Sequence, residues 1–204
     1  MSLAIDVYTV KLDDLRTILR SRSSRRVNFI NKQSSAEFDS LREQLDDDNE
    51  DRTAFTYEDA VHDLLFNRLQ TTYDWHIYGY AIQAILDTYA EYCGNWPQIT
   101  NLVRFTEHLN EILIEHDVGL DVTNLTYGGG PKGTFPTADD GFSASSQWPE
   151  WGCWSASQCK SILPKLKRID ISSLDPMDHE NVQNLVDWVG AAVRRKSMII
   201  GFVC

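Results

Sequence analysis

The sequence has no long apolar run, no paired-cysteine motif and no excess of positive charge. Its apolar runs fall well short of the ~20 residues that cross a bilayer, so no membrane-spanning segment is expected. The four cysteines include no C-x-x-C pair, and the start of the chain lacks the basic and apolar regions of a secretory leader. These features predict reduced thiols and a cytoplasmic location.

Negative charge is what the chain has in excess. Lys and Arg number 19 against 30 Asp and Glu, which gives a formal net charge of -11. A surface of this kind repels phosphate backbones, so nucleic acid is not expected as a partner. The same charge speeds the encounter with a basic protein, which is the kind of partner we expect.

The apolar pattern predicts a mainly helical α+β fold. With 204 residues and 42% hydrophobic content, the chain can bury one core, and we expect a single domain over 1–204. Alternation over 3–10 and the apolar run 198–203 each indicate a strand, and we expect the two to pair in a small sheet. A third strand is expected from 119–125 or from 151–154.

Helical spacing predicts helices over most of the remaining chain. The segment 77–92 is apolar almost all round and is expected to be the central core helix, ending at Gly94. Pro97 is expected in the first turn of the next helix. Near the start, a short helix is expected to carry Val27, Phe29 and Ile30. Start signals include Ser23 or Ser24, Thr56, Ser155 with Gln158, and Asp175 followed by Pro176.

Glycine, proline and serine dominate a stretch at about 118–151, where no periodic pattern remains. We expect a long loop there, and such loops are often functional. The segment 128–134 superficially resembles a phosphate-binding loop, but Lys132 and Thr134 stand in the wrong order and no helix follows. Its backbone, with Tyr127 and Lys132, is instead a candidate partner contact.

Tryptophans recur every third residue at Trp148, Trp151 and Trp154, but Pro149 and Gly152 prevent a regular helix. Tryptophan side chains more often pack in the core than lie at the surface. If two of these rings are exposed beside the loop, they would form an aromatic anchor of the kind that dominates protein interfaces. They are therefore the leading candidates for a partner-binding site.

A metal site is the alternative. His108, Glu111 and Glu115 share a helix face, and Glu58 and His62 stand four residues apart on another helix. Imidazole and carboxylate groups on facing helices can hold a transition metal. The simpler interpretation is that these residues form the polar outer faces of the helices, and that interpretation is favoured.

No other pattern indicates catalysis or a cofactor. The chain lacks a G-x-S-x-G nucleophile motif and a cofactor-binding loop, so no cofactor is expected and a non-catalytic protein is favoured over an enzyme. Positive charge gathers near the start of the chain, where solvated faces are the favoured interpretation. The residues concerned are Arg16, Arg20, Arg22, Arg25 and Arg26.

Four short segments resemble a group of small, uncharacterised bacterial proteins of the YfbM type. They are Ile5-Asp6-Val7-Tyr8, Tyr78-Gly79-Tyr80-Ala81, Trp151-Gly152-Cys153-Trp154-Ser155 and Ile200-Gly201-Phe202. The resemblance implies a bacterial cytosolic α+β protein of unknown function, with some relatives similar to immunity proteins. We therefore expect a protein-binding module, such as an immunity-type protein for a basic partner, with a metal-dependent enzyme as the alternative.

Overall fold

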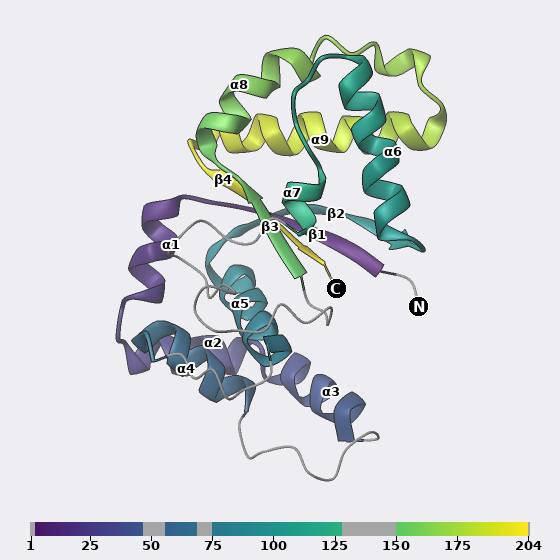
Figure 1. Cartoon of the computed structure of the whole chain (residues 1–204). Coiled ribbons are helices and arrows are strands. Elements are labelled where there is room, and N and C mark those ends of the chain that lie inside the picture. The colour runs from purple at the N-terminus through teal and green to yellow at the C-terminus, as the bar shows by residue number, and fades with distance from the viewer. Residues whose placement is uncertain (1–2, 47–55, 69–74, 128–149, 204) are drawn as a thin grey trace.

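In the part of the chain that the structure describes, four antiparallel strands form one sheet with helices on both faces (Figure 1). The computed structural model describes residues 3–46, 56–68, 75–127 and 150–203. The strand order is β2-β1-β4-β3. The strands are β1 (Leu3–Val10), β2 (Glu91–Ile99), β3 (Glu150–Trp154) and β4 (Met198–Val203).

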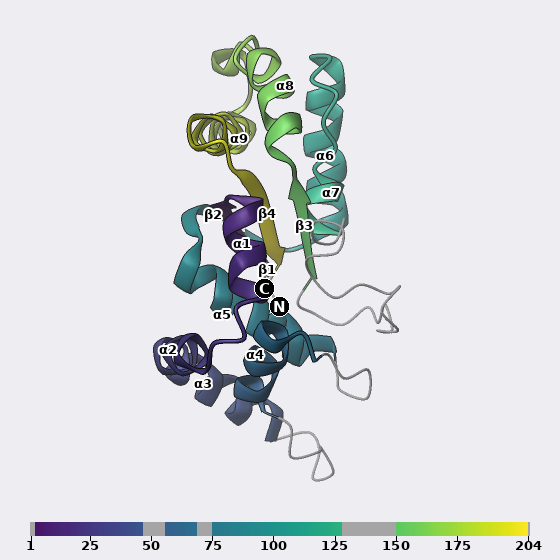
Figure 2. The ribbon, with the colours of Figure 1, turned by 90° about the vertical axis from the view of Figure 1, so that its left-hand side faces the viewer.

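The helices before β2 lie on one side of the sheet and those after β2 lie on the other (Figure 2). The first layer contains α1 (Leu12–Leu19), α2 (Ser24–Gln33), α3 (Ser35–Asp46), α4 (Tyr57–Phe66) and α5 (Trp75–Tyr89). The second layer contains α6 (Leu102–Glu115), α7 (Thr123–Thr126), α8 (Ala156–Leu166), the 3-10 turn η2 (Ile171–Ser173) and α9 (Pro176–Arg195).

Each central strand contributes side chains to two separate cores. On β1, Tyr8 and Val10 pack with the first helical layer, whereas Ile5 and Val7 pack with the second. Successive side chains of a strand point to opposite faces, which explains this division. Every residue of β4 is buried, so the almost wholly apolar composition of 198–203 follows from its position between two cores.

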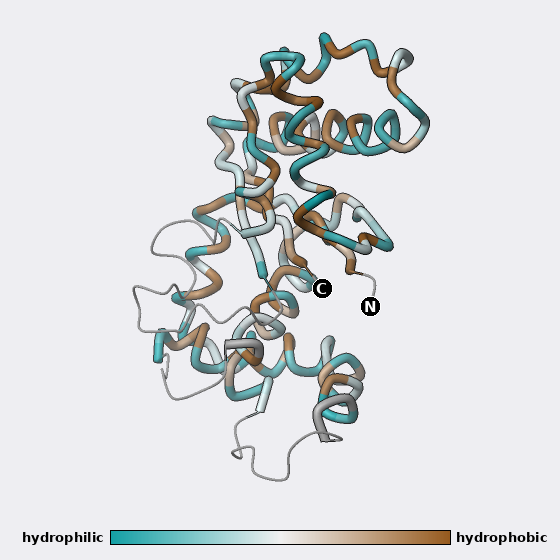
Figure 3. The backbone as a smooth tube through the Cα atoms, turned by 45° about the vertical axis from the view of Figure 1, so that its right-hand side comes forward, coloured by the Kyte–Doolittle hydropathy of each residue, from teal (hydrophilic) through white to brown (hydrophobic). Residues whose placement is uncertain are grey.

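The helices are amphipathic, and brown and teal stretches alternate along the backbone (Figure 3). Their starts carry the expected caps. Thr56 and Ser155 form capping boxes with Asp59 and Gln158, and Asp175 accepts hydrogen bonds from the first turn of α9. Each cap satisfies backbone N–H groups that have no partner within the helix.

The structure confirms the α+β class and the pairing of the two terminal strands, which run antiparallel from Ile5↔Val203 to Val10↔Met198. It also confirms a third strand around 151–154, as β3. The other expected location, 119–125, is wrong for a strand, because part of it forms the short helix α7. Among the described residues, no helix is both long and apolar enough to cross a bilayer.

The prediction for the region around Gly94 was wrong. The core helix α5 ends at Tyr89, and Gly94 and Pro97 lie in β2 instead of at helix ends. Because β2 is an edge strand, it tolerates the missing N–H of proline. Gly94 has a φ of 133° beside a register shift against β1, a backbone conformation that favours glycine.

Candidate functional site

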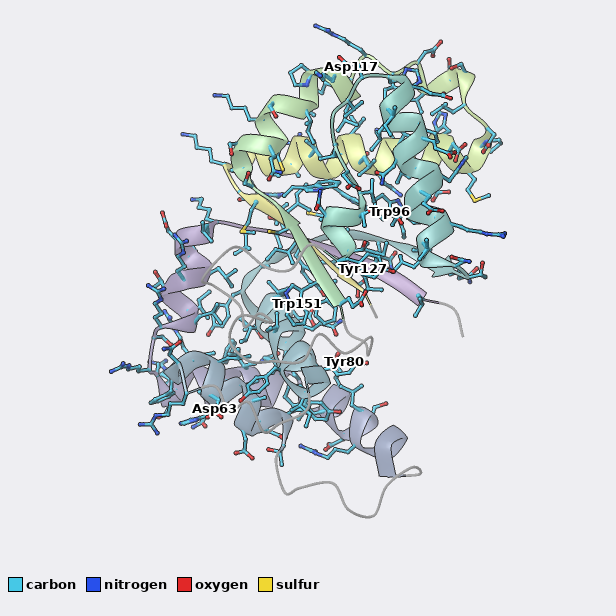
Figure 4. The ribbon with its side chains drawn as sticks, viewed as in Figure 1. Asp63, Tyr80, Trp96, Asp117, Tyr127 and Trp151 are labelled. Atoms are coloured by element: carbon cyan, nitrogen blue, oxygen red, sulfur yellow. The ribbon has the colours of Figure 1, made fainter. Side chains whose placement is uncertain are left out.

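The candidate tryptophans that the structure describes are core residues. Trp151 and Trp154 are 3% and 1% exposed. Trp151 stacks on Phe202, with ring centroids 6.2 Å apart, and lies between the sheet and α5 (Figure 4). Trp154 belongs to the opposite core and donates a hydrogen bond from Nε1 to the carbonyl O of Asp121 at 3.2 Å. Because the two tryptophans stand three positions apart on one strand, an odd number, their rings point to opposite faces.

These two rings therefore do not form one exposed aromatic anchor. Of the other partner-binding candidates, Trp148 and Lys132 lie outside the described residues. Tyr127, which follows α7, is 41% exposed (Figure 4). Only Tyr127 among the described candidates is thus available at the surface.

The structure does not bring the metal candidates together. Glu58 and His62 lie on α4 and pack with the first layer, whereas His108, Glu111 and Glu115 lie on α6 in the second layer. The sheet separates the two helices. Glu58 forms an ion pair with Arg42, and His108 Nε2 lies 2.8 Å from Asp178 Oδ1. Within the described ranges, no group of three or more His, Cys, Asp or Glu side chains could hold a metal ion.

The residues on α6 instead form an acidic, partly apolar surface, which we call the α6 face. Glu107, Glu111 and Glu115 are exposed and follow one another every four residues, so they lie along one side of the helix. Val103 and Ile114 of the same helix are 54% and 73% exposed. No described residue forms an ion pair with these glutamates.

A cleft of about 430 Å³ lies between α6 and α8 beside this face. Its lining combines apolar side chains with amide, hydroxyl and carboxylate groups: Asn110, Ile114, Gly119, Leu120, Asp121, Asn124, Trp154, Gln158, Ser161 and Ile162. The cleft is open to solvent at Ile114, which is mostly exposed. Its apolar walls suit an apolar side chain and its rim suits a cation.

Asn110 holds one wall of the cleft in place. Its Oδ1 accepts from the Val122 backbone N–H at 2.7 Å, and its Nδ2 donates to Asp121 Oδ1 at 2.8 Å and to Thr123 Oγ1 at 3.2 Å. Partial burial would raise the pKa of Asp121, but hydrogen bonds from Thr123 and Asn110 outweigh it and lower that pKa. Asp121 is therefore a fixed negative charge at the cleft at neutral pH.

A second set of titratable groups lies on the other side of the sheet. Tyr8 Oη donates to Asp87 Oδ1 at 2.6 Å. Burial raises the pKa of both groups, and the negative charge of Asp6 raises both further. Burial and the charges of Asp87 and Asp6 also raise the pKa of Glu37. Glu37 and Asp87 line a hollow of about 350 Å³.

The described cysteines do not offer a nucleophile. Cys93, Cys153 and Cys159 are free thiols. Burial raises the pKa of Cys153 to about 11 and that of Cys159 to about 12, and it also raises the pKa of Cys93. All three are therefore protonated at neutral pH, and it is the thiolate that reacts.

A comparison with protein families gives one match. The family described as Domain of unknown function (DUF7691) matches residues 1–204. The chain belongs to the DUF7691 family. No curated protein and no solved structure matches this DUF7691 chain.

Sequence reasoning missed the cleft of this DUF7691 protein and the surface around Phe29. The sequence predicts Phe29 among the apolar residues of its helix, with Val27 and Ile30, and its side chain is 49% exposed. Helical geometry contained the signal, since residues advance by about 100° each and Phe29 stands about 200° from Val27. The cleft could not be predicted from the sequence, because Asn110 and Asp121 come into contact only when the chain turns back after α6.

Proposed function

We propose that the protein is a non-catalytic binding module whose α6 face and adjoining cleft bind a basic segment of another protein. The observation that carries this proposal is the exposure of Ile114, at 73%, beside both the cleft and the unpaired glutamates of α6. An apolar side chain of the partner would enter the cleft. Its lysine or arginine residues would pair with Glu107, Glu111 and Glu115.

The charge arrangement on α6 supports this role. Like charges four residues apart destabilise an isolated helix by about 0.2–0.5 kcal/mol per pair. Glu107, Glu111 and Glu115 form two such pairs, and no described residue forms an ion pair with them. A basic partner would relieve this repulsion on binding. The net charge of -11 adds long-range attraction for the same partner.

The proposed contacts define the partner as a basic protein segment that carries an apolar side chain. An immunity-type role in a bacterial cytosol, in which the protein neutralises a basic toxin, fits the same chemistry and remains part of this proposal. The described residues include neither a group of metal ligands nor a reactive thiol, so they offer no support for the alternative of an enzyme. The α6 face is thus the surface to test first.

The experiment compares capture of lysate proteins by the wild type and by the triple variant Glu107→Gln, Glu111→Gln, Glu115→Gln. A second variant, Ile114→Ser, removes the apolar group beside the cleft. Bound proteins are identified by mass spectrometry at low and at high salt. We expect one basic protein that the wild type retains, that high salt releases and that both variants fail to retain.

A matched control separates the site from total charge. Glu43→Gln, Glu180→Gln and Asp187→Asn change exposed residues on α3 and α9 and alter the net charge by the same amount. This control should retain the basic protein. Equal retention by the wild type and the α6 variants would contradict the proposal, and equal loss from the control would show that only overall charge matters.

A further inference from the structure

A basic hollow lies where α1 meets α2, on the side of the sheet opposite the α6 face. Its volume is about 710 Å³. Three arginines, from α1, the residue that follows α1, and α2, line it together with hydroxyl groups and one carboxylate: Asp13, Arg16, Thr17, Arg20, Ser21, Ser23 and Arg26. Arg22 and Arg25 stand beside these residues in the sequence and are exposed. The hollow therefore concentrates positive charge on an otherwise acidic protein.

Among the residues that the structure describes, the side chains of Arg16, Arg20 and Arg26 have no ion-pair partner. Arg26 Nη1 donates to the carbonyl O of Thr17 at 3.3 Å, which connects the two helices. The net negative charge of the protein does not cancel this local field, because salt screens exposed charges beyond about 8 Å at physiological ionic strength.

The backbone fixes the shape of the hollow. Arg22 has a φ of 46°, which is uncommon for a residue other than glycine. Its N–H donates to the carbonyl O of Leu65 on α4 at 3.2 Å. Ser23 caps α2, so the positive end of that helix dipole lies at the hollow. Ser21 Oγ is buried and has no hydrogen-bond partner among the described residues.

An aromatic hollow adjoins the basic one. Its volume is about 550 Å³, and it shares Ser23 and Arg26 with the basic hollow. Its other lining residues are Arg25, Asn28, Phe29, Lys32 and Tyr89. Phe29 is 49% exposed, and an exposed ring of this kind offers a face on which a planar group can stack.

We propose that these two hollows form one site for a nucleotide. Its phosphate groups bind Arg16, Arg20 and Arg26, and its base stacks on Phe29. Arginine suits the first task because its planar guanidinium group binds phosphate oxygens in pairs. The orientation follows from a third hollow that Phe29 also lines, where Glu37 and Asp87 would repel phosphate. This site does not depend on the function proposed for the α6 face.

The test measures binding of ATP, inorganic pyrophosphate and adenosine to the full chain by calorimetry, in buffer without divalent metal. ATP should bind at least about tenfold more tightly than adenosine, because the arginines bind its phosphates. It should also bind more tightly than pyrophosphate, because its base stacks on Phe29. A nucleotide that binds no better than pyrophosphate would overturn the proposal.

Two variants assign the contacts. Arg16→Gln with Arg20→Gln should weaken both ATP and pyrophosphate by at least about tenfold. Phe29→Ala should weaken ATP by about tenfold and leave pyrophosphate unchanged. Arg26 is left intact because it connects α1 to α2. Circular dichroism confirms that each variant is folded.

The matched control is Arg104→Gln with Arg168→Gln. Both residues are exposed on the other side of the sheet, and the pair changes the net charge equally. The control should bind ATP as the wild type does. Equal weakening in the control, or no ATP binding by the wild type, would overturn the proposal. Much tighter binding of a single-stranded oligonucleotide than of ATP would also overturn it, since the ligand class would then be nucleic acid.

Discussion

Gly152 and Gly201 lie opposite each other on β3 and β4, and the backbone of α7 lies directly on both (Figure 1). A Cβ atom at Gly152 would stand 2.1 Å from the carbonyl O of Asn124. One at Gly201 would stand 2.5 Å from the carbonyl O of Leu125. These glycines are therefore required by the close approach of a helix backbone to the sheet.

Gly201→Ala should lower the free energy of unfolding by about 1–3 kcal/mol, because the new methyl group forces α7 away from the sheet. Urea unfolding followed by circular dichroism measures this change. The control is Gly190→Ala in α9, where the nearest atom to the added Cβ is the Nη1 of Arg194 at 3.4 Å. Replacing glycine by alanine in a helix interior stabilises the helix by up to about 1 kcal/mol, so the free energy of unfolding of this variant should not fall. Equal effects of the two substitutions would contradict the contact at α7.

Trp151→Ala and Trp154→Ala should each lower the free energy of unfolding by about 3–5 kcal/mol, since each removes a large buried ring. Trp154→Phe should lower the free energy of unfolding by less. It loses about 1 kcal/mol with the hydrogen bond to Asp121, and a small further amount because the smaller ring packs less well. Denaturant unfolding checks all three variants.

Tyr127→Ala is the control for these tryptophan variants. Tyr127 is 41% exposed, so the substitution should change stability by no more than about 0.5 kcal/mol. If either tryptophan-to-alanine variant kept its full stability, the ring would not be a core residue, and an exposed aromatic anchor would again be possible.

The terminal strands could be predicted from the sequence because β1 and β4 are buried and therefore rich in apolar residues. The strand β2 could not, because Gly94 and Pro97 are also typical of helix ends. What distinguishes the two cases is the edge position of β2 beside β1, which depends on contacts between residues about 90 apart in the chain, such as Val7 and Gly94.

The candidate sites depended on tertiary contacts even more strongly. The face of α6 was identified as polar from its sequence, but its cleft requires α8 and the Asn110–Asp121 hydrogen bond. From the sequence alone, the arginines near the start of the chain predict only solvated faces. They line one hollow only because the turn at Arg22 brings α1 against the start of α2.

The raised pKa of Glu37 predicts how stability depends on pH. A carboxyl group whose pKa is higher in the folded state binds its proton more tightly there. Its stabilising contribution is therefore complete below the unfolded pKa, about 4.3 for Glu, and is lost as pH rises through the folded pKa. Burial and the charges of Asp87 and Asp6 cause the shift, so ionised Glu37 destabilises the fold at neutral pH.

Glu37→Gln should consequently raise the melting temperature at pH 7 and have little effect at pH 4, where the wild-type carboxyl is largely protonated. Thermal unfolding at both pH values measures the difference between variant and wild type. Glu43→Gln, an exposed residue on the same helix, controls for the loss of one negative charge and should show a smaller change between the two conditions. An equal effect of Glu37→Gln at pH 4 and pH 7 would show that the carboxyl does not titrate in this window. Burial of the ionised Glu37 carboxylate near Asp87 and Asp6 would then not lower the stability of the fold at neutral pH.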